Sequence, residues 1–241
     1  EIGAGVAGNI SDIELRYQLY AVNGPLGYDD GPKLSGRKPI RGARQKGSQV
    51  TISDFDLSGR LTYYGIRGLN FGFSGYFGQT ESSLFNNLNQ DSTTLSRQAD
   101  SSSIGINMIS SDFRYQLKNF EARVEVIWMN LTNTNEYNSI TNQDLGKTTY
   151  GYYAEVGYNI GSALNLKNKL VPFVRYSNYD THHKVSTKQN KNLAYSNEVI
   201  TTGISCFLNP NFVVKADYQQ QKNGNNTKTN TFNAGIGYWF R

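Results

Sequence analysis

The chain has 241 residues and a formal net charge of +5, with 37% hydrophobic and 13% aromatic residues. No stretch approaches the roughly 20 consecutive apolar residues of a membrane-spanning helix, and the aromatic content argues against a disordered chain. A single cysteine excludes an internal disulfide, two histidines leave little material for a transition-metal site, and the mild positive charge suggests anionic partners without demanding nucleic acid.

Strict alternation of apolar and polar residues recurs along the chain and predicts β-strands. In chain order, the clearest examples are residues 54–63, 69–77, 120–128, 150–160, 212–219 and 232–240. In the first of these, Phe55, Leu57 and Leu61 share one face, whereas Asp56 and Arg60 lie on the other. No segment shows a comparable 3.6-residue stripe. We therefore predict an all-β chain of about eleven strands, from residues 2–8 to residues 231–240.

The connectors between these segments alternate between short and long. Short ones cover residues 9–12, 67–68, 118–119, 161–169 and 209–211, and long polar ones cover 24–49, 81–100, 133–146, 181–194 and 221–229. A transmembrane β-barrel has short periplasmic turns and long extracellular loops, together with strands of about ten residues and aromatic girdles. We therefore predict that residues 1–241 form a single domain, a transmembrane antiparallel β-barrel. A soluble sandwich or lectin-like fold is the alternative.

Successive strands of a barrel run alternately up and down, and this order predicts on which side of the membrane the chain begins and ends. If the last strand ends on the periplasmic side, the strand at residues 2–8 descends from outside and needs an ascending partner before it. We therefore expect the chain to be the C-terminal part of a larger barrel that is incomplete at its N-terminus. The first residue is Glu1, without a leader sequence, which fits this expectation.

Two segments resemble known outer-membrane sequences. The last strand reads Gly235-Ile236-Gly237-Tyr238-Trp239-Phe240 and resembles the signal read by the barrel-assembly machinery, in which Tyr238 and Phe240 would be the recognised aromatics; here Arg241 follows the phenylalanine. Residues 15–24, LRYQLYAVNG, and residues 3–8, GAGVAG, resemble the mid-barrel segment of the phosphate-selective porin family. This resemblance implies a trimer of barrels in the bacterial outer membrane, each with about sixteen strands.

The longest connector carries six cations and no acid across fourteen positions. They would attract phosphate-bearing solutes at a pore mouth by Coulomb steering, and arginine could bind oxyanions through paired hydrogen bonds. Alternatively, the loop stays outside, where it is solvated or binds anionic lipopolysaccharide. These residues are Lys33, Arg37, Lys38, Arg41, Arg44 and Lys46.

Charged residues also occupy the polar face of the strands, where a water-filled lumen is expected, since charge facing lipid costs about 2–4 kcal/mol at the midplane. They either tune ion selectivity or brace the wall through salt bridges, and the near balance of signs argues against a strongly anion-selective ladder. The cations are Arg16, Arg60, Arg114, Arg123, Arg175 and Lys215, and the acids are Asp54, Asp56, Asp112, Glu121, Glu125, Glu155 and Asp217.

Three other features have simpler explanations. Residues 3–8 match G-x-G-x-x-G, but a strand rather than a helix follows, so a dinucleotide site is not expected. Some outer-membrane proteases use an Asp–His pair at the rim, and Asp180 precedes His182 and His183. A catalytic base needs a positioned partner, and no second acidic pair is placed beside them, so they are interpreted as loop histidines. Cys206 is interpreted as a small apolar residue.

The function expected from these patterns is passive diffusion of small hydrophilic solutes through an outer-membrane porin, with a preference for anions or phosphate set by pore width and lining charge. Such a protein is not an enzyme and needs no cofactor or metal. Expected partners are outer-membrane lipid and lipopolysaccharide, small anionic or neutral solutes, the barrel-assembly machinery, and further copies in a homotrimer or larger complex. The alternatives are a non-conducting accessory barrel subunit and a rim-active enzyme.

Overall fold

The computed structural model describes residues 2–45, 54–87 and 93–240. Within these residues, eleven antiparallel strands form one sheet in which each strand pairs with the next along the chain. This arrangement confirms the predicted all-β architecture. The strands are β1 (Gly3–Ile10), β2 (Leu15–Asn23), β4 (Phe55–Tyr63), β5 (Leu69–Gln79), β7 (Gly105–Leu117), β8 (Phe120–Leu131), β9 (Thr148–Tyr158), β10 (Lys169–Lys184), β11 (Ser196–Asn209), β12 (Phe212–Asn223) and β13 (Lys228–Tyr238).

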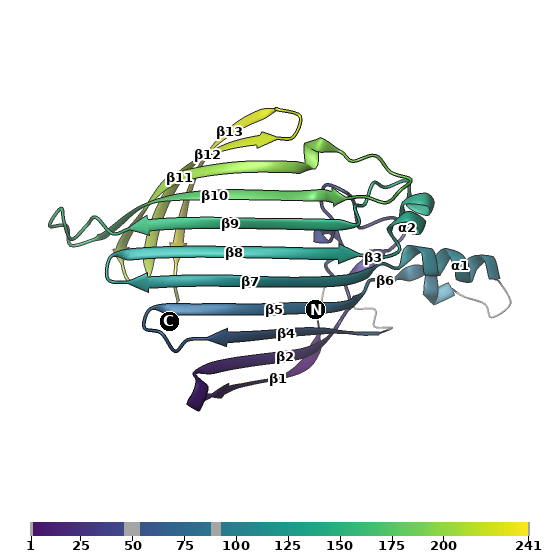
Figure 1. Ribbon diagram of the computed structural model, residues 1–241, viewed down its shortest axis with the longest axis horizontal. Coiled ribbons are helices and arrows are strands. Elements are labelled where there is room, and N and C mark those ends of the chain that lie inside the picture. The colour runs from purple at the N-terminus through teal and green to yellow at the C-terminus, as the bar shows by residue number, and fades with distance from the viewer. Residues whose placement is uncertain (1, 46–53, 88–92, 241) are drawn as a thin grey trace.

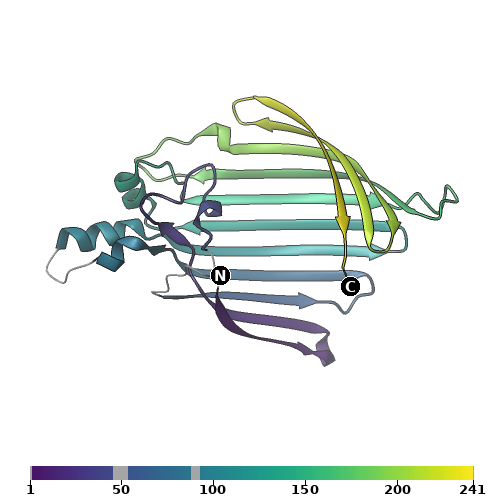
Figure 2. The same ribbon diagram turned by 180° about the vertical axis from the view of Figure 1, so that it is seen from behind.

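The sheet curves into a trough with one convex and one concave face. In Figure 1, β12 and β13 bend away behind the strands that precede them, and Figure 2 shows them passing in front of the sheet when it is seen from behind. The segment that follows β2 lies on this same concave side (Figure 2). A meander of neighbouring strands with the right-handed twist of β-structure is what a barrel wall requires.

The apolar side of each strand faces outward and is exposed. Leu57 keeps 53% of its surface exposed, whereas its neighbour Asp56 keeps 1%. The same exposure recurs across the sheet at Val6, Leu19, Leu61, Phe73, Val126, Val156, Val174, Ile200, Val214 and Ile236. A soluble sandwich would bury this face under a second sheet, but the other sheet in the described residues has only two strands, β3 (Leu26–Tyr28) and β6 (Glu81–Ser82). The fold is therefore that of a transmembrane β-barrel wall.

The long connectors gather at one end of the sheet and the turns at the other (Figure 1). The long connectors contain helices that the sequence pattern did not predict, because these helices are short and lie outside the alternating segments. They are α1 (Thr93–Ser102), α2 (Thr134–Thr141), η2 (Arg41–Ala43), η3 (Ser83–Asn87) and η4 (Leu193–Tyr195), while η1 (Ser11–Ile13) forms the first turn. Among the described residues, none of the helices is long and apolar enough to cross a membrane.

Several predicted boundaries are wrong. The connector expected at 221–229 is a tight turn at 224–227, since β12 and β13 stay paired as far as Lys222 and Lys228. The turn expected at 161–169 is a projecting loop at 159–168 (Figure 1). The first and last strands cover 3–10 and 228–238 rather than 2–8 and 231–240. A hydrogen-bonded ladder continues wherever backbone groups pair, whether or not one face remains apolar.

The main packed core lies at the loop end of the concave face. It joins the segment after β2 to β7, β8 and α2. Its buried members are Leu34, Ala43, Ile104, Ile106, Met129, Leu131, Tyr137 and Leu145.

Candidate functional site

Residues 24–45, named here the inner loop, fold onto the concave face. Leu34 and Ala43 are each 1% exposed and pack in one cluster with Ile106, Met129 and Leu131 of the wall. On their strands these wall residues are an even number of positions from the charged residues of the polar face, so they point to the same side of the sheet. Burial of such side chains stabilises the contact by about 1.5–3 kcal/mol for a Leu-sized group. The inner loop therefore lies inside the trough, an orientation that its sequence left open.

Tyr137 of α2 fastens the inner loop through its hydroxyl. The hydroxyl donates a hydrogen bond to Gly27 O at 2.8 Å and accepts one from Leu34 N at 3.2 Å. The side chain is fully buried, and this burial raises the pKa of Tyr137 above its ordinary value. A protonated hydroxyl is what the two bonds require, because it donates one and accepts the other.

A second fastening centres on His182 of β10. The pairing of β10 with β9 shifts register between Asp180 and Lys184, and such an irregularity re-aims side chains. His182 is fully buried; its Nδ1 accepts a bond from Asn192 N at 3.1 Å, and its Nε2 lies 2.5 Å from Asp144 O. Since Nδ1 accepts, the proton sits on Nε2, which donates to the carbonyl.

Groups around His182 connect this network to the inner loop. Gly36 N donates to Asp144 Oδ1 at 2.9 Å, and Thr181 Oγ1 donates to Gly36 O at 2.6 Å. Tyr195 donates to the other oxygen of Asp144 at 2.7 Å. The network therefore binds four separate segments together at the loop end of the barrel.

Asp180 and His182 are both members of this hydrogen-bond network. The Asp180 carboxylate accepts bonds from His182 N at 2.8 Å and from Lys191 Nζ at 2.7 Å. The interpretation of His182 and His183 as loop residues is wrong, since both lie in β10 and His182 is buried. His183 points elsewhere, and its ring lies 5.2 Å from that of Trp128 and 4.8 Å from that of Tyr150.

Ion pairs cross the inner wall between strands. Arg60 lies 2.7 Å from Asp112. Glu155 lies between two arginines, with Arg175 at 2.6 Å and Arg123 at 3.5 Å. Each acid is mostly shielded from solvent, so these pairs neutralise charge along the wall and brace neighbouring strands.

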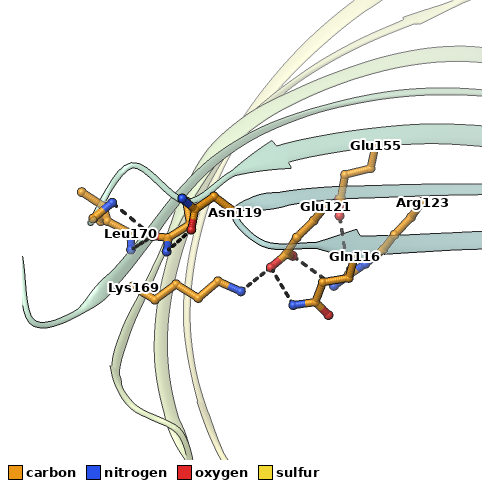
Figure 3. Close-up of polar contacts among 9 residues, drawn as sticks. Gln116, Asn119, Glu121, Arg123, Glu155, Lys169 and Leu170 are labelled. Carbon is orange, nitrogen blue, oxygen red and sulfur yellow. Dashed lines mark hydrogen bonds and ion pairs between the residues drawn. The ribbon is translucent and has the colours of Figure 1, made fainter. Parts of the chain in front are cut away.

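Figure 3 shows the turn end of this network. Glu121 accepts contacts from Lys169 and from Gln116, and Arg123 reaches it at 3.9 Å. Arg123 extends from there toward Glu155. The predicted wall cation Arg123 is thus shared between two carboxylates.

The remaining wall cations have weaker partners. Arg114 is largely exposed and lies 3.8 Å from Asp112, while Arg16 donates to Asn9 at 3.2 Å. Lys215 lies 4.3 Å above the ring of Phe173, a cation–π contact. Arg16, Arg60 and Arg114 line a common hollow of about 530 Å³ on the wall.

The inner loop differs from the wall because four of its cations have no ion-pair partner among the residues that the structure describes. Arg37, Lys38, Arg41 and Arg44 are exposed, and within the described residues none has a carboxylate within 4.0 Å. Lys33 pairs with Asp29 at 3.5 Å, and Lys46 lies outside the described residues. Four cations within eight positions of the inner loop, residues 37–44, therefore carry positive charge that no ion pair among the described residues neutralises.

The apolar wall residues under the inner loop were not identified from the sequence. Ile106 and Met108 on β7, and Met129 and Leu131 on β8, take lumen-side positions that are charged or polar further along each strand. Apolar residues at these normally polar positions of the strands are the sequence signal that a loop packs against the wall there.

The two aromatic residues of the predicted assembly signal lie at the end of the last strand. Tyr238 and Phe240 are exposed, with ring centroids 4.7 Å apart.

Comparisons with known proteins identify the fold. No family model matches the chain. An uncharacterized protein of Aquifex aeolicus is 24% identical over 250 residues, covering 100% of this chain and 53% of its own length. The anion-selective porin from Comamonas acidovorans superposes with a TM-score of 0.56 at 9% identity, over 97% of this chain and 57% of that protein. OccK5 (OpdH) from Pseudomonas aeruginosa superposes with a TM-score of 0.44 at 14% identity, over 98% of this chain and 69% of that protein.

The chain spans about half the length of the relative it matches and 57% of the Comamonas porin. The likeness is structural, since identity is only 9%. It shows that the chain has the fold of a β-barrel porin.

Proposed function

We propose that this chain forms part of the wall and the inner loop of an outer-membrane porin that passes small hydrophilic solutes and prefers anions. The observation that carries the proposal is the location of uncompensated charge. The inner loop presents Arg37, Lys38, Arg41 and Arg44 on the concave face, above a wall where Arg60, Arg123 and Arg175 are paired with acids.

Physical chemistry supports this division of roles. Charges held in ion pairs contribute little net field, whereas exposed cations attract anions over about a Debye length, roughly 8 Å at physiological salt. Arginine can also bind phosphate or carboxylate through two parallel hydrogen bonds. Phosphate is therefore one of the anions that the inner loop would favour.

The remaining partners follow from the exposed surfaces. The apolar convex face is suited to outer-membrane lipid and the polar loops to lipopolysaccharide, and trimerisation would use part of the same apolar band. Tyr238 and Phe240 are exposed at the end of the last strand, where the barrel-assembly machinery could reach them.

Planar-bilayer recording of the intact protein tests the proposal. Replacing Arg37, Lys38, Arg41 and Arg44 by Gln should shift the reversal potential toward cation preference in dilute KCl and change little in concentrated KCl. A control variant removes four exposed cations from the other loops and the hairpin: Lys147, Lys188, Lys222 and Lys228. Stable channels with equal shifts for both variants would contradict the role of the inner loop. Absence of any conductance would favour a non-conducting barrel.

A further inference from the structure

A cavity of about 530 Å³ lies between the inner loop and the wall. Its wall side is formed by Tyr76, Ile106 and Met108, and its loop side includes Ile40, Arg41 and Arg44. This volume lies within the range typical of small-molecule sites, about 300–1,000 Å³.

The two sides of the cavity differ in chemistry. Ile106 is buried, and Met108 and Ile40 pack against the same apolar cluster. The Tyr76 hydroxyl donates to Asp56 Oδ2 at 2.5 Å, so this ring lines the cavity while its polar tip is directed to the carboxylate. The wall side is therefore an apolar floor.

The opposite side carries two guanidinium groups. Arg41 begins the short helix η2, and Arg44 follows its last residue with an extended backbone. Ala43 between them is buried in the core, which fixes the backbone from which both arginines extend. Both side chains line the cavity and are also exposed, so a solute can reach them.

We propose that this cavity is a subsite for organic anions that have an apolar body, such as aromatic carboxylates. The carboxylate would bind Arg41 and Arg44, and the ring would rest on Ile106, Met108 and Tyr76. The inference rests on the proposed porin function, because it names a solute class for the inner loop. It differs from a general preference for anions, since it requires the apolar body as well as the charge.

The test compares three probes on the intact protein: benzoate, acetate with the same charge, and benzyl alcohol with the ring alone. Benzoate should block channel current in dilute KCl at concentrations at least tenfold below those of the other two. The double variant R41Q/R44Q should weaken benzoate block by about 10- to 100-fold, the range of a charge-assisted hydrogen bond. M108Q, close in volume, should reduce the advantage of benzoate over acetate.

A matched double variant, R37Q/K38Q, removes the same charge from the inner loop but from residues that do not line the cavity. It should shift the reversal potential about as much as R41Q/R44Q while changing benzoate block less than threefold. Equal block by benzoate and acetate, with both reversal potentials shifted, would overturn the subsite and leave the porin intact. If no channels form, titration of benzoate into the detergent-solubilised protein decides the subsite by itself, and binding no tighter than that of acetate would overturn it.

Discussion

Substituting Tyr137 by phenylalanine should loosen the inner loop without unfolding the barrel. The change keeps the ring and removes only the hydroxyl, which leaves Leu34 N without its partner inside a fully buried contact, while Gly27 O keeps the hydrogen bond from Lys33 N. Each unsatisfied buried group costs about 1–3 kcal/mol. The one amide left unpaired should lower the free energy of loop opening by about 1–3 kcal/mol, a factor of roughly 5 to 150 in the opening equilibrium.

Hydrogen exchange followed by mass spectrometry measures this equilibrium directly. Lys33 N donates to Gly27 O and Ala43 N to Ile40 O in the native loop, so their protection reports docking. Peptides from residues 26–45 should exchange faster by the same factor, whereas peptides from β9 should be unchanged, since local opening is separate from global unfolding. Equal acceleration in β9, or none in the loop, would refute the assignment of Tyr137 as the fastening of the inner loop.

Three further changes test other parts of the structure. Leu61→Arg on the convex face should destabilise the barrel in lipid by about 2–4 kcal/mol if Leu61 lies near the bilayer midplane, whereas Gln18→Arg on the concave face should be tolerated; urea unfolding in liposomes compares them, and equal losses would contradict the assignment of faces. Gly36→Ala should increase protease cleavage of the inner loop, because a Cβ there would collide with His182 Nε2; unchanged cleavage would show that the network yields easily. Burial, the larger cause, and the hydrogen bond to the Asp144 carboxylate, the smaller one, raise the pKa of Tyr195 above 10.0. The contribution of Tyr195 to loop docking is therefore fully present below about pH 10 and is lost as the pH rises through the folded-state pKa. Ultraviolet titration of tyrosinate in the wild type and in Tyr195→Phe checks this, and a difference spectrum that titrates at the ordinary pKa would contradict it.

The strands and their faces could be predicted from alternation alone. Phe55, Leu57 and Leu61 were assigned to one face of β4, and all three are exposed on the convex surface. The signal is strong because lipid selects apolar residues on one side and water selects polar residues on the other over the whole membrane thickness. Beyond that thickness it fades, which is why the hairpin through Lys222 and Lys228 was interpreted as a loop.

The direction of the inner loop could not be predicted. Leu34 stands alone in a polar segment, and its partner Tyr137 is 103 residues away, so no local period links them. Likewise, the re-aiming of His182 depends on a register shift between strands, which the sequence of β10 does not reveal. Contacts of this kind depend on long-range packing rather than on local pattern.

Accessibility of spin labels along β4 in lipid bilayers tests the central claim most directly, namely that the convex face meets lipid and the concave face meets water. Labels would be placed singly from residue 55 to residue 63 after Cys206→Ser removes the native thiol. Labels at Phe55, Leu57, Leu61 and Tyr63 should collide with oxygen dissolved in lipid, and those at Asp56, Ser58, Arg60 and Thr62 with a water-soluble nickel chelate, with a period of two. Uniform access to the chelate at both sets of positions, or the opposite phase, would contradict the account.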